Sequence, residues 1–359
     1  MGMLGEIGSR AGHSLRATLA GGALLAAGLV GGPALAQEVT LKLHQFLPAQ
    51  APVPRDVLVP WMEKVTKESD GRIAFQHFPA MQLGGRPPEL IDQAIDGVTD
   101  IVWTLPGYTP GRFPRTEVFE LPFMMSDPVA ASRALWSVAE AEMLGTDFKD
   151  VHVIGLWVHG PGVIHADVPI RDVGDMKGLN LRAPTRVTGR LIEALGANPV
   201  GMPVPQVAEA LTRGVIDGAI VPWEVTGAIR SSELVANHTE FDGPALYTAV
   251  FLLAMNKARY EGLPDDLKAV LDANSGAAFA ATAAEATAAA DAGPRQAAID
   301  RGNAIVELSA EESAAWRAAA EPTVAAWVDQ VSGEGIDGQA LLEAARAAIG
   351  AEEMTGGAN

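Results

Sequence analysis

An arginine stands where a short β-strand is expected to end. Gly178 supplies a turn, residues 179–181 (Leu-Asn-Leu) predict a brief strand, and Pro184 stops it just after Arg182. In open α/β sheets, ligands bind outside the carboxyl ends of the strands. A guanidinium there can give a carboxylate two parallel charge-assisted hydrogen bonds. A surface arginine or an internal salt bridge remains the alternative, because most arginines are exposed.

Other kinds of site chemistry find little support in the sequence. The chain contains no cysteine, which excludes disulfides, thiol nucleophiles, Cys-ligated zinc and iron–sulfur clusters. It has no Gly-x-Ser-x-Gly or His-Glu-x-x-His motif and no Gly-rich phosphate loop. The His, Asp and Glu residues show no metal-ligand spacing. We therefore expect no enzyme activity, no cofactor and no metal.

The charge balance restricts the partners. The chain has 26 basic and 44 acidic residues, a formal net charge of −18. Such a surface argues against nucleic acid or an anionic membrane as partner. It does not exclude an anionic ligand, because the Debye length is about 8 Å at physiological salt and one buried arginine can dominate locally.

The first 36 residues have the pattern of a cleaved secretory signal. Arg10 and Arg16 precede an almost entirely apolar or small stretch at residues 17–30, and Ala34 and Ala36 suit a signal peptidase cut after Ala36. A membrane anchor is the alternative, but that stretch is short for a span, which needs about 20 residues. We expect a periplasmic protein with no stable membrane insertion after cleavage.

The remaining chain alternates predicted strands and helices, which indicates an α/β fold with mostly parallel strands. The predicted strands lie at residues 39–46, 72–78, 100–105, 151–158 and 247–255, with short apolar runs at 198–202 and 219–221. Residues 264–300 are Ala-rich and predict a scaffold helix. Residues 309–330 predict a helix that packs through Trp316, Val324 and Trp327.

The segment around Arg182 resembles the signature of the solute-binding proteins of tripartite ATP-independent periplasmic (TRAP) transporters. Residues 175–182 follow its pattern of Asp/Glu-Leu/Met-Lys-Gly-Leu-x-Ile/Leu-Arg. Further matches occur in the family's order, at Gln82-Leu83-Gly84-Gly85, Glu89-Leu90, Glu120-Leu121-Pro122-Phe123 and the stretch from Glu209 to Gly218. The resemblance runs from about residue 39 to residue 308.

This resemblance implies a two-lobed periplasmic binding protein fold, with strands that cross between the lobes and a long C-terminal helix. Lobe I would comprise residues 37–158 plus about 250–290, and lobe II residues 159–249 plus about 291–359. Arg182 would grip the carboxylate of a small organic acid in the cleft. The closed complex would deliver that acid to a membrane permease.

Two departures from the family pattern bear on the ligand. Gly162 falls about where many relatives carry a second arginine, and Val221 precedes Pro222 where relatives often have asparagine. Both changes remove partners for a second carboxylate or a 2-hydroxyl group. We therefore expect a monocarboxylate with an apolar or aromatic body. The candidate lining residues are His44, Phe46, Trp103, Tyr108, Pro222, Trp223 and Tyr247.

Each of these candidates has a structural alternative. Trp103 could belong to the core, and His44 and Phe46 share one strand face, so one of them is expected to line the site. Gly162 could let backbone N–H groups approach the ligand, or it could belong to a hinge turn. As whole-protein alternatives, two lobes and a carboxylate-binding arginine also suit a binding protein for an ABC importer or a sensor. A periplasmic enzyme is a further alternative.

Overall fold

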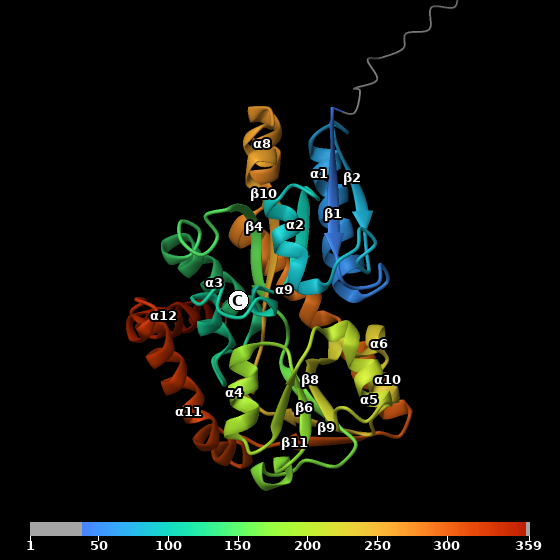
Figure 1. The fold of residues 1–359 in the computed structure, drawn as a ribbon, viewed down its shortest axis with the longest axis vertical. Coiled ribbons are helices and arrows are strands. Elements are labelled where there is room, and N and C mark those ends of the chain that lie inside the picture. Colours follow the sequence, from blue (N-terminus) through green and yellow to red (C-terminus); the bar gives the residue numbers. More distant parts are fainter. Residues whose placement is uncertain (1–37, 357–359) are drawn as a thin grey trace, which may run out of the picture. The chain divides into compact units, whose positions relative to one another are not determined.

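The computed structural model describes residues 38–356; the predicted signal peptide lies outside this range. One lobe is built on a five-stranded sheet in the order β2-β1-β3-β10-β4 (Figure 1). Strand β1 is parallel to β2 and β3, whereas β10 is antiparallel to β3 and β4. The strands are β1 (Val39–Gln45), β2 (Ile73–Phe78), β3 (Ile101–Thr104), β4 (Val151–Val158) and β10 (Val250–Asn256).

The second lobe is built on a six-stranded sheet in the order β11-β9-β5-β8-β6-β7. Strands β6 and β8 are parallel neighbours, so their carboxyl ends, which carry Arg182 and Pro222, lie at the same edge. The strands are β5 (Gly162–Ala166), β6 (Asn180–Ala183), β7 (Asn198–Gly201), β8 (Gly218–Pro222), β9 (Asn237–Phe241) and β11 (Ala304–Leu308). The predicted α/β fold with two lobes is confirmed.

Helices flank both sheets. The shorter ones are α1 (Val59–Glu68), α2 (Leu90–Ile95), α4 (Arg186–Ala194), α5 (Val207–Thr212), α6 (Trp223–Ile229) and α7 (Lys257–Glu261). The longest helix before the second lobe is α3 (Pro128–Glu142), which Asp127 caps by accepting from the N–H groups of Val129 and Ala130. Capping of this kind satisfies N–H groups that have no partner inside the helix.

The Ala-rich segment is divided into three helices, so a single continuous helix was the wrong prediction. They are α8 (Asp265–Ala273), α9 (Gly276–Ala289) and α10 (Ala292–Asp300). The first break falls before Gly276, whose φ of +80° does not fit a helix. The second break has a packing reason. Helix α9 packs on α3 and β4 of the first lobe, whereas α10 packs on α6 of the second.

The C-terminal segment, assigned to lobe II in the sequence, contacts both lobes. The long helix α11 (Glu312–Gly333) packs against α4, and α12 (Gly338–Gly356) packs against α3 (Figure 1). Trp316, Val324 and Trp327 of α11 are buried, as predicted. Besides this segment, the chain passes between the lobes from β4 to β5, from β9 to β10 and from α9 to α10. These passages are the predicted crossing connections.

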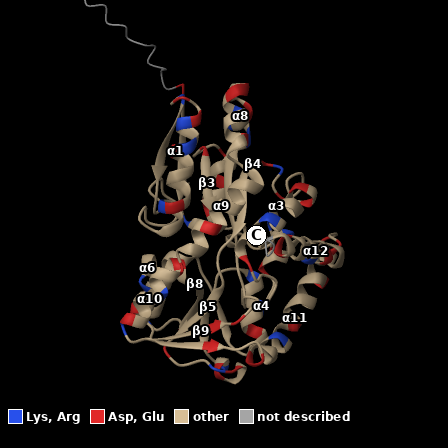
Figure 2. Ribbon diagram, turned by 180° about the vertical axis from the view of Figure 1, so that it is seen from behind, with Lys and Arg blue, Asp and Glu red and all other residues tan. Residues whose placement is uncertain are grey.

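The interior is apolar, and the charged residues lie mainly on helices and loops around it. Strands β3, β4, β5 and β8 contain no charged residue (Figure 2). In β4, Gly155 lets the ring of Phe279 on α9 lie directly on the sheet, and that ring also meets Trp157 edge to face at 5.7 Å. A Cβ atom at position 155 would lie 2.3 Å from Cδ1 of Phe279.

Gly155→Ala should therefore destabilise the protein by about 1–3 kcal/mol, because the ring and helix α9 must move to admit a methyl group. Chemical unfolding followed by tryptophan fluorescence measures the change. Gly145→Ala is the matched control, since a Cβ atom there meets nothing within 4 Å. Equal stability of the two variants would contradict this account of the β4–α9 contact.

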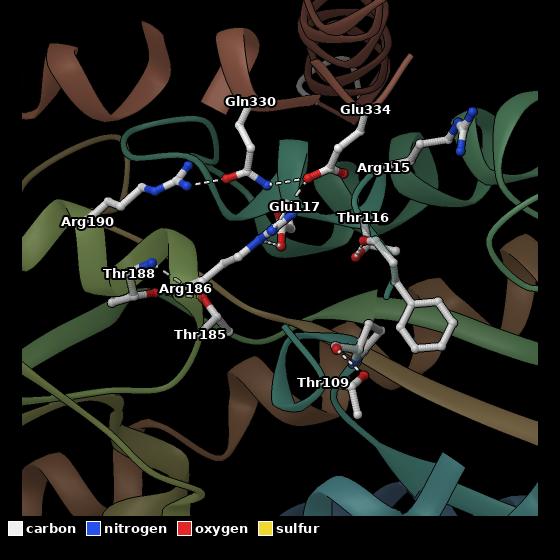
Figure 3. A network of polar contacts seen from close by, with 12 residues as sticks. Thr109, Arg115, Thr116, Glu117, Thr185, Arg186, Thr188, Arg190, Gln330 and Glu334 are labelled. Atoms are coloured by element: carbon white, nitrogen blue, oxygen red, sulfur yellow. Dashed lines mark hydrogen bonds and ion pairs between the residues drawn. The ribbon is translucent and has the colours of Figure 1, made fainter. Parts of the chain in front are cut away.

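A polar network joins the lobes at α4 (Figure 3). Arg186 donates from Nε to Oε1 of Glu117 at 2.5 Å, and its Nη1 lies 3.8 Å from Oε1 of Glu334. Gln330 donates to the same Glu334 oxygen at 2.9 Å and accepts from Arg190. Glu117 belongs to the 3₁₀ helix Thr116–Glu120, Arg186 to α4, and Glu334 follows α11. Three distant segments therefore meet through charged groups.

Glu120 is the most deeply buried acid of this region, with 1% of its surface exposed. Its Oε1 accepts from the N–H of Val250 at 3.2 Å, and the hydroxyl of Thr185 across the lobes is a further partner. Its Oε2 has no hydrogen bond within residues 38–356. Burial, and secondarily the charge of Glu117, raises the pKa of Glu120 to about 8.

This raised pKa predicts a pH-dependent stability. In the unfolded chain Glu120 loses its proton near pH 4.5, whereas the folded protein holds it to about pH 8. The stabilising contribution is thus complete below about pH 4.5 and is lost as the pH rises to about 8. Glu120→Gln cannot ionise, so the free energy of unfolding should fall less steeply with pH across this window.

Urea denaturation at several pH values measures that slope. Glu321→Gln, which removes an exposed carboxyl from α11, should keep the wild-type slope. A Glu120→Gln variant with the same slope as the wild type would show that Glu120 is ionised in the folded protein at neutral pH.

Candidate functional site

A pocket lies between the two sheets, and both lobes contribute to its walls. Six of the predicted site residues line it, namely Phe46, Trp103, Tyr108, Arg182, Pro222 and Tyr247. Most of the other lining residues are apolar. The combination of an apolar wall with few polar groups is typical of small-molecule sites.

Arg182 brings a buried positive charge to this pocket. Only 2% of its surface is exposed. Its Nε donates to the carbonyl of Met202 at 3.0 Å, and its Nη1 donates to the carbonyl of Ile220 at 3.1 Å. No carboxylate of the described residues forms an ion pair with it. A buried charge is costly unless it is paired, and the two carbonyls orient this guanidinium without neutralising it.

Two tyrosines fix the surroundings of this guanidinium. The hydroxyl of Tyr247 donates to the carbonyl of Ile220 at 3.3 Å, so this carbonyl serves both Tyr247 and Arg182. The hydroxyl of Tyr108, from the other lobe, accepts from the N–H of Val204 at 3.1 Å and lies beside Arg182. Burial raises the pKa of both phenols, which therefore stay neutral near the charge.

Aromatic rings of the first lobe form the apolar wall. Phe46 and Trp103 stack with centroids 4.5 Å apart and planes 20° from parallel. Tyr108 meets Phe46 edge to face at 5.6 Å, and Phe251 meets Trp103 in the same way at 5.2 Å. Rings that pack on one another have little freedom, so a flat ligand would meet a preformed surface.

His159 also lines the pocket, but both of its ring nitrogens are engaged with the backbone. Nδ1 donates to the carbonyl of Gly160 at 2.6 Å, and Nε2 accepts from the N–H of Ala249 at 3.0 Å. Burial lowers the pKa of His159 to about 4, so the imidazole is neutral. His159 follows β4 and Ala249 precedes β10, so this contact joins two of the segments that cross between the lobes.

Gly162 is not a lining residue, and the structure gives it a packing reason. A Cβ atom there would lie 2.0 Å from Cδ1 and Cε1 of Tyr247. The tyrosine ring thus occupies the space that a side chain at position 162 would need. The N–H of Gly162 donates to the carbonyl of Tyr247 at 2.9 Å rather than pointing to a ligand.

The structure also places His44 and Trp223 away from the pocket. His44 bonds through Nδ1 to Oε1 of Gln93 at 2.7 Å, and Phe46 alone of the pair reaches the pocket. Trp223 begins α6 and donates from Nε1 to Oε1 of Glu240 at 2.6 Å. Its ring packs against His165 and His238 at 4.8 and 4.7 Å.

The sequence reasoning missed Glu224. This residue lines the pocket and has 2% of its surface exposed. An acidic residue in the first turn of a helix is usually explained by the helix dipole, so its type and position gave no reason to place it inside. The apolar residues Val204, Val225 and Leu105 were missed for the related reason that ordinary core residues look the same in sequence.

Two further searches of residues 38–356 bear on the site and its setting. No group of three or more His, Cys, Asp or Glu side chains in this range is arranged to hold a metal ion. Within the same range, none of the helices has the length and apolar character needed to cross a membrane.

Comparison with known proteins identifies the family. The family described as bacterial extracellular solute-binding protein, family 7, matches residues 43–330. A TRAP solute-binding protein from Rhodoferax ferrireducens T118, solved with copurified benzoate, is 48% identical with a TM-score of 0.87. The match covers 89% of this chain and 99% of that chain.

Two other relatives extend the comparison. A marine metagenome TRAP solute-binding protein specific for aromatic acid ligands, solved with metahydroxyphenylacetate, is 45% identical with a TM-score of 0.86, covering 88% of this chain and 99% of that one. The C4-dicarboxylate-binding periplasmic protein DctP of Rhodobacter capsulatus is 26% identical over 314 residues, 85% of this chain and 91% of its own length. The family match spans most of the chain, so this protein belongs to the family 7 extracellular solute-binding proteins, the solute-binding proteins of TRAP transporters.

Proposed function

We propose that this chain captures a small aromatic monocarboxylate of the benzoate class in the periplasm and delivers it to the permease of a TRAP transporter. One observation carries the proposal: Arg182 is buried, has no acidic partner among residues 38–356, and lines an aromatic pocket. The carboxylate would bind the guanidinium fork, and the ring would lie against Phe46 and Trp103.

The charges of the pocket favour a ligand with one carboxylate. Arg182 is the single Lys or Arg among the lining residues, and Glu224 is the single acid. A second carboxylate would find no second cation among the lining residues, and an unpaired charge is unfavourable in a buried site. The Rhodoferax and metagenome relatives, with benzoate and metahydroxyphenylacetate, support the same ligand class.

Ligand capture would use closure of the two lobes. Phe46, Trp103 and Tyr108 come from one lobe and Arg182 from the other, so the ligand contacts both only when the lobes are together. A ligand stabilises a closed form through the better contacts that it makes there. The approach is already close in this structure, since a Cβ atom on Gly107 would lie 2.3 Å from Cγ2 of Thr185.

The proposed function also includes export of the chain and delivery of the bound ligand. Cleavage after Ala36 would release a mature chain of residues 37–359 into the periplasm. Its lobes would be divided near residues 158, 249 and 290, with the last helices bridging them. TRAP family membership supports a membrane permease as the partner that receives the ligand.

Arg182→Ala in the mature chain should weaken benzoate binding by about 30-fold or more, because truncating one partner of a buried charge pair costs about 2–5 kcal/mol. Arg182→Lys should lose about tenfold, since an ammonium cannot form two parallel bonds. Isothermal titration calorimetry measures both. Arg213→Ala, which removes an exposed arginine of an ion pair with Glu209, should bind as the wild type does.

The apo variants should keep the wild-type melting temperature or exceed it, because the substitutions do not leave a buried partner charge behind. A folded Arg182→Ala protein with near-normal affinity for benzoate would refute the site. A clear preference of the wild type for succinate or malate over benzoate would refute the ligand class.

A further inference from the structure

The pocket holds a second polar group that the chain itself does not satisfy. Glu224, in the first turn of α6, has its Oε2 atom buried without a hydrogen bond within the described part of the chain. The helix end is already neutralised by another acid, because the N–H of Glu224 donates to Oδ1 of Asp291 at 2.7 Å. The carboxyl group of Glu224 is therefore not explained by capping or by an ion pair.

An unsatisfied donor lines the same pocket from the other lobe. Trp103 is fully buried, and its Nε1–H has no acceptor within residues 38–356. The indole is held by stacking on Phe46 and by the edge-to-face contact with Phe251, so its orientation is restricted. Buried polar groups without partners are rare and costly, and those in a ligand pocket commonly await the ligand.

The two groups have complementary requirements. An indole N–H can only donate, whereas a carboxyl group can accept and, when protonated, can also donate. Burial, more than the nearby charge of Asp291, raises the pKa of Glu224 well above its ordinary value, which favours the protonated group. A hydroxyl group both accepts and donates, so it suits either partner. An ammonium group would find only the carboxyl group, because the indole N–H cannot accept a hydrogen bond.

Resting on the function proposed above, we propose that Glu224 is the specificity determinant for a hydroxyl group on the aromatic acid, with Trp103 as a second donor to that hydroxyl. The preferred ligand is then a hydroxylated aromatic acid. Position 221 has no asparagine to serve such a group, and Glu224 supplies a polar partner three residues further along the chain.

Calorimetric titrations of the mature chain with benzoate, 3- and 4-hydroxybenzoate, and the two corresponding methylbenzoates test this inference. A methyl group has nearly the size of a hydroxyl group but makes no hydrogen bond. The wild type should bind at least one hydroxybenzoate about tenfold or more tighter than its methyl counterpart, since a site built to bond a hydroxyl rejects analogues that lack it.

Three variants locate the effect. Glu224→Leu should reduce the affinity ratio of the hydroxybenzoate over its methyl counterpart to about one, because the hydroxyl contact is lost. Glu224→Gln should keep most of the preference, since an amide also donates and accepts. Trp103→Phe keeps an aromatic ring and should lose part of the preference. Glu209→Leu, an exposed change on α5, is the control.

The outcomes separate the two proposals. Equal wild-type binding of hydroxy- and methylbenzoates overturns the inference about Glu224 but leaves benzoate capture intact. Failure of every aromatic acid to bind overturns both. If the wild-type preference survives in folded Glu224→Leu and Trp103→Phe, other groups recognise the hydroxyl and the assignment is wrong. Should Glu224→Leu not fold, Trp103→Phe decides the same question.

Discussion

A buried guanidinium without a carboxylate partner is the constraint on which the rest of the site depends. The carbonyls of Met202 and Ile220 hold Arg182, and Tyr247 holds the second of these carbonyls. These bonds orient the charge but do not neutralise it. Shielding it from water requires both lobes, and this explains why the aromatic wall comes from one lobe and the arginine from the other. The net charge of −18 matters less, because solvent screens the surface.

Much of the fold could be predicted because short stretches of sequence indicate its strands and its helix ends. Strand β4 is a buried, mostly apolar run, the first part of β1 alternates buried apolar residues with more exposed ones, and Asp and Gly residues mark several helix ends. The Ala-rich segment was less informative. Alanine favours a helix everywhere and does not say which lobe it packs on, so the breaks at Gly276 and near Asp291 were missed. The position of α12 on α3 likewise depends on long-range packing that no single segment encodes.

The site was predictable where chemistry and strand geometry coincide. Arg182 ends a strand, and Phe46, Trp103 and Tyr247 are large rings on or beside buried strands, so the structure brings all four together. At the β8–α6 junction, the sequence did not indicate which side chains line the pocket. The chain turns from strand to helix there, so Trp223 packs away from the pocket and bonds to Glu240, whereas Glu224 lines the pocket. A local pattern does not fix such a rotation, and an acid at a helix start is ordinarily exposed.

The most direct test of the account is a crystal structure of the mature chain with benzoate bound. The account predicts carboxylate oxygens about 2.7–2.9 Å from nitrogen atoms of the Arg182 guanidinium. The ring should lie against Phe46 and Trp103, enclosed by both lobes. Benzoate bound with its carboxylate turned away from Arg182, or at a site outside this pocket, would contradict the central claim that the unpaired guanidinium exists to hold the ligand.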